Sequence, residues 1–432
     1  MTTPAPAPAP APERDKTDVV VEKFLDGAST DIAAYLEACV HCGECAEACH
    51  FFLATGEAKY TPTHKLKPLV DAYKREKAPF STLKRALALA PPKLTEDTLR
   101  EWEPLVYDSC TLCGRCTTVC PMGIDIAGTI RKMREGYNAA GIVPDGLARS
   151  VDYVKKTSSP MGVTLKAVKA TIAHQEKETG LKIEIDKKGA DYMAIFSSME
   201  IMGYPEVIGA YARMFQKAGL SWTISSTAYE ATNVGVQIGS TPLAHDIVKR
   251  VVDAAEALEV KHVISPECGH AYGAIRWAGP NLMGREFKFE VVHIIELMDR
   301  LRREGRLPAG DKDMRKMTLH DPCQIVRRGG LVKEPRRLMD DSCGNFVEMK
   351  GAGITNLCCG GGGGVSANPR AAELQKAAFG CKLDQIDAIG GIETVVVPCA
   401  NCRSVFEDGL DEYGSDLEVI GLGELVASTL AP

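Results

Sequence analysis

The sequence predicts an α+β protein of several domains, with a helical cysteine-rich region followed by two related α/β halves. Three observations lead to this prediction. Two cysteine runs with the same spacing lie within a helical N-terminal third. Short apolar strands alternate with helical segments after residue 191, as in α/β folds. Two strand-and-loop motifs of that region occur again later in the chain, which indicates an internal duplication.

Composition and the N-terminal segment indicate a cytosolic protein. The 432 residues include 16 cysteines, but a chain of this length does not need disulfides, and the clustering favours metal ligation. Residues 1–29 begin with an Ala-Pro repeat and are predicted to be a disordered tail rather than a signal peptide. No apolar stretch reaches the roughly 20 residues that cross a bilayer. The net charge of −6 argues against nucleic acid as a ligand.

Residues 30–145 are predicted to form the helical domain. Segments 31–38 and 126–140 have helical spacing, and segment 65–90 is rich in helix formers, broken at Pro68 and Pro79. Segment 65–90 also carries seven basic residues, for which a solvated helix face is favoured over a docking patch. These residues are Lys65, Lys67, Lys74, Arg75, Lys77, Lys84 and Arg85.

The two cysteine runs both have the spacing C-x2-C-x2-C-x3-C, which is typical of proteins that hold two [4Fe–4S] cubanes. In this motif the fourth cysteine of each run serves the other cluster. We therefore expect one cubane on Cys39, Cys42, Cys45 and Cys120, and a second on Cys110, Cys113, Cys116 and Cys49. Gly43 and Gly114 lie within the loops, and His50 stands where a proline usually follows the run. A zinc site would instead use two separate C-x2-C pairs.

The rest of the chain divides into a linker and two halves. Residues 146–190 are polar and irregular in pattern and are predicted to be a linker. The clearest strands are expected near 194–196, 262–264, 317–319 and 395–397. They place one α/β half at 191–312 and a second at 313–432.

The duplication pairs segment 193–201 with 317–325, and 261–270 with 393–402. In this alignment Met199, Glu267 and His270 stand opposite Cys323, Cys399 and Cys402, respectively. The second half also carries the adjacent pair Cys358 and Cys359, whereas Cys268 is the only cysteine of the first half. The second half is therefore expected to hold a metal site that the first half has lost.

Three motifs of the second half resemble the CCG domain of the heterodisulfide reductase family. They are His320-Asp-Pro-Cys323, Cys358-Cys359-Gly360 and Pro398-Cys399-Ala-Asn-Cys402. The resemblance implies that the five cysteines bind a non-cubane [4Fe–4S] centre. The interval from Cys359 to Cys399 is somewhat longer than the family pattern.

The resemblance extends from about residue 31 to the C-terminus. A two-cubane ferredoxin-like domain followed by two CCG-type halves resembles the fused D subunit of heterodisulfide reductase. It is also similar to the K subunit of the sulfite-reductase-linked membrane complex and to subunits of transmembrane cytochrome c redox complexes. Since the first motif is degenerate, one non-cubane centre is expected.

Residue chemistry independently favours an open cluster in the second half. Five thiolates exceed the needs of one cubane, and adjacent cysteines do not comfortably reach separate corners of one cube. Glycines 360–364 allow backbone amides to approach cluster sulfur, so Gly360 and Gly361 are candidate cofactor-binding residues together with His320. A flexible loop is the alternative for the glycine run. His320 and Asp321 are expected to orient the loop that presents Cys323.

Two further residues are candidates for catalysis. His270 is a candidate proton donor to a departing thiolate, with Cys268 beside it. With equal weight, Cys268 is a buried thiol and His270 a hydrogen-bonded interface residue. Cys343 and Cys381 are expected to serve packing. Four arginines after Cys323 are candidates for binding an anionic substrate or acidic partner, with a solvated face at least as favoured: Arg327, Arg328, Arg336 and Arg337.

The resemblance implies an iron–sulfur oxidoreductase subunit that exchanges electrons with a small disulfide or a protein persulfide at the non-cubane centre. Its expected partner is a membrane cytochrome b, a quinone-reactive subunit or a flavoprotein, which would hold it on the inner face of the membrane. One alternative is an electron relay for a flavin dehydrogenase that oxidises glycolate, lactate or glycerol 3-phosphate. The other is a protein whose metals only hold the fold. No G-x-G-x-x-G follows a strand, so a nicotinamide or flavin site is expected in another subunit.

Overall fold

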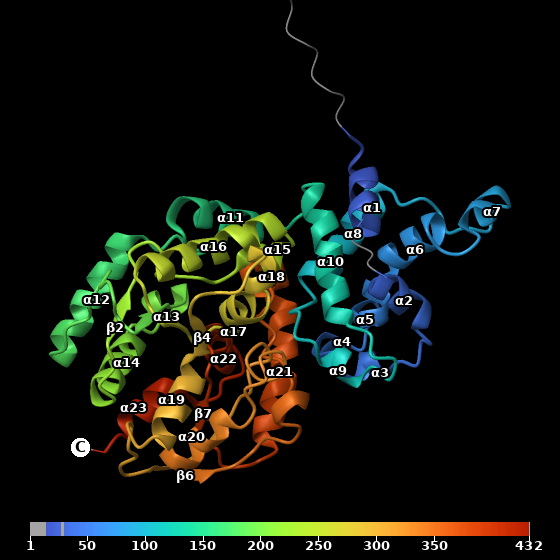
Figure 1. The fold of residues 1–432 in the computed structure, drawn as a ribbon. Coiled ribbons are helices and arrows are strands. Elements are labelled where there is room, and N and C mark those ends of the chain that lie inside the picture. The colour runs from blue at the N-terminus through green and yellow to red at the C-terminus, as the bar shows by residue number, and fades with distance from the viewer. Residues whose placement is uncertain (1–13, 27–29, 432) are drawn as a thin grey trace, which may run out of the picture.

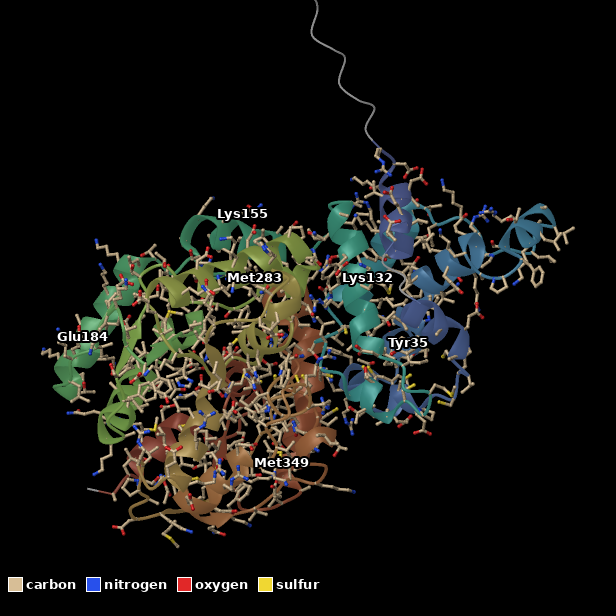
Figure 2. The ribbon with its side chains drawn as sticks, viewed as in Figure 1. Tyr35, Lys132, Lys155, Glu184, Met283 and Met349 are labelled. Atoms are coloured by element: carbon tan, nitrogen blue, oxygen red, sulfur yellow. The ribbon has the colours of Figure 1, made fainter. Side chains whose placement is uncertain are left out.

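The computed structural model describes residues 14–26 and 30–431. A helical domain lies on one side of the molecule and two α/β halves lie on the other, with helix α10 (Ile126–Ala139) along their junction (Figure 1). Lys132 of this helix marks the junction among the side chains of Figure 2. The predicted fold class is confirmed: a helical N-terminal domain precedes two α/β domains with parallel sheets. In the described part of the chain, no helix combines the length and apolar character required to cross a membrane.

The helical domain consists of short helices joined by the cysteine loops. Pro68 does not break a helix, because it lies in the first turn of α6, where the missing amide has no intrahelical partner. The chain turns instead at Leu66 and after α6. The helices before α10 are α2 (Thr30–Ala38), α3 (Glu44–Glu47), α4 (His50–Thr55), α5 (Pro62–Lys65), α6 (Lys67–Glu76), α7 (Ser81–Ala86), α8 (Glu96–Tyr107) and α9 (Arg115–Val119).

Part of the predicted N-terminal tail is a helix, α1 (Lys16–Asp26). Val20 and Phe24 are spaced four residues apart and are fully buried, which anchors α1 on α10. Gly136 permits this contact, because a Cβ there would lie 2.6 Å from the Phe24 ring. The prediction of disorder is wrong for α1, and residues 1–13 and 27–29 lie outside the described residues.

The segment 146–190 was expected to be an irregular linker, and this expectation is wrong. It contains α11 (Asp145–Thr157) and α12 (Leu165–Thr179). Thr164 caps α12 by accepting a hydrogen bond from the amide of Ala167. Val168 and Ile172 are buried on one stripe of the helix, so packing compensates for a polar composition.

The first half has a parallel four-stranded sheet in the order β2-β1-β3-β4. Apolar side chains from its strands enter two separate clusters, one with helix α14 and one with helix α16, so both faces of the sheet are covered. The strands are β1 (Tyr192–Ala194), β2 (Trp222–Ile224), β3 (His262–Ser265) and β4 (Glu290–His293). The helices are α13 (Ser198–Met202), α14 (Glu206–Lys217), α15 (Val234–Ile238), α16 (Thr241–Ala257), α17 (Gly269–Tyr272), α18 (Gly279–Met283) and α19 (Ile294–Arg303).

The second half repeats this topology in a parallel sheet of order β6-β5-β7-β8. Helix α14 packs on α23, and α19 packs on α20, so equivalent pairs meet across a pseudo-two-fold axis. The strands are β5 (Asp313–Leu319), β6 (Cys343–Phe346), β7 (Thr394–Val396) and β8 (Glu418–Ile420). The helices are α20 (Glu334–Ser342), α21 (Ala372–Asp387), α22 (Ala400–Glu412) and α23 (Leu422–Ser428).

The strand register corrects the first pairing of the duplicated motifs. The amide of Ile195 donates to the Ile264 carbonyl, and the amide of His320 donates to the Val396 carbonyl. Ile195 is therefore equivalent to His320. Counting three residues onward places Ser198, rather than Met199, opposite Cys323.

The second pairing changes as well. Cys268 is the N-cap of α17, just as Cys399 is the N-cap of α22. Ile264 and Val396 are equivalent in the two sheets, and three residues lie between Ile264 and Cys268 where two lie between Val396 and Cys399. This insertion makes Cys268 the counterpart of Cys399. The first half thus keeps one thiol at an equivalent place.

Candidate metal centres

The first cavity of interest is lined by cysteines from both runs. Cys39, Cys42, Cys45 and Cys120 all face it. Gly43 adopts a φ of 87° at the start of α3, a conformation that favours glycine and lets the loop fold around the cavity. Tyr35, labelled in Figure 2, also lines the cavity. Four thiols around one space are the donor set of a cubane.

A second cavity has the complementary set. It is lined by Cys110, Cys113 and Cys116, together with Cys49 from the first run. Gly114, with a φ of 76°, begins α9 as Gly43 begins α3. Burial raises the pKa of the Cys116 thiol well above its ordinary value, so ionisation there calls for a cation such as cluster iron. The donor set again fits a cubane, in the crossed arrangement expected from the spacing.

Lys65 does not lie on the solvated helix face that was expected for the basic residues. It is 2% exposed and lies against the second cavity. Its ammonium group approaches the sulfur of Cys49 at 3.9 Å, donates to the Ser109 carbonyl and lies over the Phe51 ring. The pattern of basic residues in the sequence does not predict this buried position of Lys65.

The third group consists of the five cysteines of the second half. Cys323 follows β5, Cys399 and Cys402 begin α22, and the adjacent pair lies in the glycine loop, so three separate segments converge. The sulfurs of Cys323 and Cys358 are 3.9 Å apart, and those of Cys359 and Cys402 are 3.3 Å apart. Contact with the Cys402 thiol lowers the pKa of Cys399. All five are buried, and the continuous set of thiols fits an iron–sulfur centre.

The glycine run is a site of close packing rather than a flexible loop. A Cβ on Gly363 would lie 2.6 Å from the carbonyl carbon of Thr111, and one on Gly361 would lie 2.4 Å from Val405. Contact with Cys358 lowers the pKa of Cys359, and the amide of Gly361 adds to this effect. The loop thus brings a backbone amide to cysteine sulfur, as the glycines suggested.

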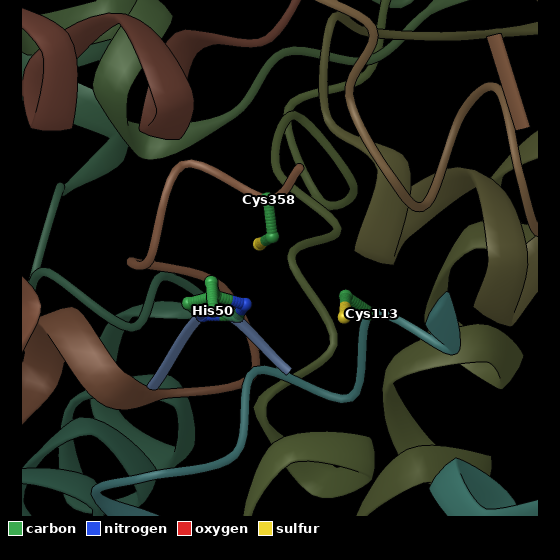
Figure 3. A group of neighbouring side chains, drawn as sticks. All are labelled: His50, Cys113 and Cys358. Carbon is green, nitrogen blue, oxygen red and sulfur yellow. The ribbon is translucent and has the colours of Figure 1, made fainter. Parts of the chain in front are cut away.

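The second cavity and the third group are in contact. Ligand atoms of His50, Cys113 and Cys358 lie within 4.8 Å of one another, and all three residues are buried (Figure 3). Contact with the Cys358 thiol raises the pKa of Cys113. Cys358 also donates to the hydroxyl of Thr111 at 3.4 Å. The residue in place of the usual proline, His50, therefore lies where the two sets of cysteines meet.

Comparisons with known proteins agree with this division. A family model described as a 4Fe-4S dicluster domain matches residues 35–124, and one described as a cysteine-rich domain, CCG, matches residues 317–407. The Hdr-like menaquinol oxidoreductase iron-sulfur subunit 2 of Archaeoglobus fulgidus is 27% identical, over 92% of this chain and 80% of the relative. The D subunit of the dihydromethanophenazine:CoB–CoM heterodisulfide reductase of Methanosarcina acetivorans is also 27% identical, over 91% of this chain and 94% of its own length.

The chain therefore contains a 4Fe-4S dicluster domain and a CCG cysteine-rich domain, and it is similar to iron–sulfur subunits of heterodisulfide reductase and of a heterodisulfide reductase-like menaquinol oxidoreductase. A third relative, the EtfAB:quinone oxidoreductase of Syntrophomonas wolfei, is 26% identical over 87% of this chain and 55% of the relative.

In this CCG-domain protein, His270 makes a contact expected of an interface residue. Its Nε2 accepts a hydrogen bond from the amide of Gly363 at 3.2 Å, and burial lowers its pKa to about 4. The neutral ring therefore carries its proton on Nδ1. Burial raises the pKa of Cys268 to about 12, and its sulfur lies 3.8 Å from the Thr232 hydroxyl. These contacts favour the structural alternative, and the catalytic role of both residues stays a prediction.

His320 and Asp321 lie around the five cysteines of the CCG domain. His320 is fully buried, and one of its ring nitrogens lies within 4.8 Å of the sulfurs of Cys359 and Cys402. Asp321 binds Arg336 through two hydrogen bonds of 2.9 Å. It also accepts from the amide of Gly353, which holds the loop before Cys323 in place.

Lys382 is a second buried cation that the sequence did not reveal. It donates to Asn356 at 2.7 Å and to Gln385 at 2.6 Å. Burial lowers its pKa to about 7, and the nearby Cys358 opposes this effect. Its place on α21 gave no indication of this environment.

The four arginines after Cys323 have different roles. Arg327 donates to the carbonyls of Cys113 and Ile354, Arg336 pairs with Asp321, and Arg337 pairs with Asp299. Arg328 differs, since it faces a cleft between the domains and has one long ion pair of 3.7 Å, with Asp125.

In the first half of this CCG-domain protein, a serine hydroxyl stands where the second half has the Cys323 thiol, and two buried carboxyls lie close by. Ser198, opposite Cys323, is 2.7 Å from the hydroxyl of Ser159. Glu200 accepts from the amide of Glu267 at 3.1 Å, and the Glu267 carboxyl accepts from the amide of Gly423. Polar contacts therefore fill the position that would otherwise hold a second cluster. The cysteines outside the three groups fit packing: Cys343 is buried and donates to the Arg315 carbonyl at 3.6 Å.

Proposed function

We propose that this protein passes single electrons through two [4Fe–4S] cubanes to a non-cubane [4Fe–4S] centre, where a sulfur–sulfur bond of a substrate is cleaved or formed. The contact between Cys113 and Cys358 carries this proposal, because it joins the second cubane site to the five-cysteine site (Figure 3). The clusters, when bound, supply one-electron chemistry. Two electrons and two protons convert one disulfide into two thiols, and the reverse reaction releases them.

The arrangement of cysteines supports a chain of three centres. Cys49 and Cys120 each belong by sequence to one run and by position to the cavity of the other, so the two cubane sites are interlocked. Cys42 is exposed at the outer cavity, with Val40 and Met122 exposed beside it. We place the electron-exchanging partner at this face and the substrate at the opposite end of the chain of centres.

Two relatives suggest the partner. They belong to a menaquinol oxidoreductase and to a heterodisulfide reductase. We propose that the present chain likewise binds a membrane subunit, such as a cytochrome b or a quinone-reactive protein, and is held on the inner face of the membrane through it. A small disulfide or a protein persulfide is the proposed substrate.

A second candidate function is an electron relay without chemistry of its own. The hydroxyl pair of Ser198 and Ser159 favours it, because a half that lost its cluster can also have lost its substrate site. The similarity to the EtfAB:quinone oxidoreductase also supports an electron relay. In that case a flavoprotein partner would carry out the two-electron step.

Iron analysis combined with low-temperature paramagnetic resonance separates the two candidates. The protein is isolated anaerobically, oxidised, and measured with and without added thiols and disulfides. About twelve irons per chain and an oxidised-state signal that changes with thiol would support sulfur chemistry. About eight irons and no response to thiol or disulfide would reject it and leave the relay.

A further inference from the structure

A short arm projects from the helical domain between helices α6 and α8. It comprises residues 77–95 and includes helix α7 (Ser81–Ala86). Helix α7 stands at the end of the helical domain farthest from the two α/β halves (Figure 1). Ala78 and Leu94, near the two ends of the arm, are buried, whereas positions 82–89 are all exposed. The arm is therefore anchored at its base and open to solvent at its tip.

Polar contacts fix the base of the arm to α6. The guanidinium of Arg75 donates to the Pro91 carbonyl at 2.8 Å, and the Ser81 hydroxyl donates to the Glu76 carbonyl at 3.3 Å. Arg85 forms an ion pair with the carboxylate of Glu76. Because these contacts tie the beginning and the end of the arm to one helix, the arm keeps a defined position relative to the helical domain.

The tip of the arm exposes large apolar side chains. Phe80 is 77% exposed and Leu89 is 71% exposed. Leu83 and Leu87 are exposed as well. They are four residues apart, and Phe80 precedes Leu83 by three residues, so these three side chains share one face of the helix. A solvated face, which was expected for the basic residues of this segment, does not account for four exposed apolar side chains, and such a cluster marks an interaction surface.

The arm also carries a surplus of positive charge. Residues 77–95 include four basic residues and no acidic residue. Two of the four, Arg85 and Lys93, have carboxylate partners. The other two, Lys77 and Lys84, are exposed, and in the part of the chain that the structure describes neither has an ion-pair partner. The surface that the arm contacts is therefore expected to be negatively charged as well as apolar.

We propose that the arm docks on an anionic lipid surface. Phe80, Leu83 and Leu87 enter the acyl chains, while Lys77 and Lys84 bind the headgroups. Apolar side chains flanked by lysines are characteristic of elements that lie in a membrane surface without crossing it. Lipid also suits a tip that is exposed on all sides, because lipids enclose a side chain from every direction. The inference goes beyond the proposed function, in which a partner subunit alone holds the protein at the membrane.

Helix α6 connects this docking to the proposed path of electrons. Val70 and Lys74 of α6 line the first cubane cavity, and the arm begins directly after this helix. A docked arm therefore holds the first cubane site close to the lipid surface, where a membrane partner exchanges electrons.

Flotation with lipid vesicles tests the proposal. The intact, cluster-loaded protein is mixed anaerobically with vesicles of phosphatidylcholine alone, or of equal parts phosphatidylcholine and phosphatidylglycerol, and the floating fraction is measured as lipid concentration rises. We expect tighter binding to the vesicles with phosphatidylglycerol, and weaker binding in high salt, which screens the lysines. A protein that floats with neither kind of vesicle, or equally with both, would overturn the proposal.

The apolar contact is tested by Leu83→Ser combined with Leu87→Ser, which should weaken binding to the anionic vesicles about tenfold or more. Met202→Ser is the matched control, because Met202 and Leu87 are both 59% exposed but Met202 lies on α13 in the first half. Phe80→Trp should retain binding, since tryptophan favours the membrane interface, whereas Phe80→Ser should weaken it. Equal affinity of the wild type and the double serine variant would contradict insertion.

The headgroup contact is tested by Lys77→Gln combined with Lys84→Gln, which should weaken binding to the anionic vesicles about tenfold or more and reduce its dependence on salt. Lys166→Gln combined with Lys169→Gln, at exposed positions of α12, is the control. Unchanged cubane signals report that each variant is folded. Equal binding by the two double glutamine variants would reject an anionic lipid surface.

A further measurement separates lipid from a second copy of this chain. Sedimentation velocity without lipid reports self-association. A wild-type dimer that the substitutions at Leu83 and Leu87 convert to a monomer would assign the arm to a second copy and overturn lipid docking. None of these measurements depends on cleavage of a sulfur–sulfur bond, so vesicle binding and the response to disulfides can fail independently.

Discussion

The guanidinium of Arg134 donates a hydrogen bond of 2.6 Å to the carbonyl of Gly363 and so joins helix α10 to the glycine loop. The same group donates to the carbonyls of Cys110 and Gln237, at 2.6 and 2.7 Å. Arg134 is fully buried. One side chain therefore connects the helical domain, the first half and the second half around the proposed path of electrons.

Arg134→Met should destabilise the protein by about 3–5 kcal/mol, because several buried carbonyls lose a charged donor at once. Thermal unfolding of the cluster-loaded protein measures the effect. Arg149→Met, at an exposed position of α11, is the control and should change stability little. An Arg134 variant as stable as the control would show that the three-way contact contributes nothing.

Lys65→Met should lower the reduction potential of the second cubane by tens of millivolts, on the order expected for losing a buried positive charge near a ligand sulfur. The first cubane should change little. A redox titration followed by paramagnetic resonance measures both. Lys67→Met, which removes an exposed charge paired with Asp71, is the matched control, and equal shifts in the two variants would contradict a special role for Lys65.

Cys359→Ser should remove the non-cubane signal and leave both cubanes, reducing iron from about twelve to about eight per chain. Its sulfur is 3.3 Å from that of Cys402 and lies in neither cubane cavity. Cys381→Ser should retain all the iron. If the Cys359 variant lost all three signals together, the division into separate metal-binding domains would be wrong.

Gly363→Ala should slow electron transfer between the second cubane and the non-cubane centre, because a Cβ at 2.6 Å from the Thr111 backbone forces the loops apart. Rapid freeze-quench paramagnetic resonance after mixing with reductant measures the rate. Gly390→Ala is a matched control, since Gly390 also has a positive φ, of 72°, but no atom within 4 Å of its Cβ position. The control should cost about 1 kcal/mol in stability and leave the rate unchanged.

Glu230→Gln should remove a pH dependence of stability. Burial raises the pKa of Glu230 to about 7, so the folded state keeps a proton that the unfolded state releases above its ordinary pKa of about 4.3. Stability of the wild type therefore falls as pH rises from about 4.3 to 7, by a total of about 4 kcal/mol for this group. Denaturant unfolding at pH 5 and pH 8 should show the variant gaining relative to wild type at pH 8; parallel curves would contradict this.

Regular spacing made much of the protein predictable. The two cysteine runs predicted the crossed sets that line the two cavities, because ligand spacing follows from cluster geometry. The duplicated motifs predicted two halves, and both sheets have the same strand order. The shift at Cys268 was missed because an insertion between strand and helix leaves the apolar pattern unchanged. The shift at Ser198 was missed because Met193 and Met317 were paired although they lie one residue out of register.

Which charged side chains are buried could not be predicted from the sequence pattern. Lys65 belongs to a run of basic residues, which are ordinarily expected at the surface. It is nevertheless enclosed by Phe51 and Ser109, which come from distant segments of the chain. The cleft that Arg328 faces is likewise assembled from three parts of the chain. Helices α1, α11 and α12 were missed because polar composition concealed a narrow apolar stripe.

The contact between Cys113 and Cys358 also bears on maturation. Both thiols are enclosed between the helical domain and the glycine loop, so the scaffold proteins that deliver iron and sulfide have no access to them once the parts have docked. We therefore expect cluster insertion to precede closure of the domains. The surface on which the two sets of cysteines meet would then also set the order of assembly.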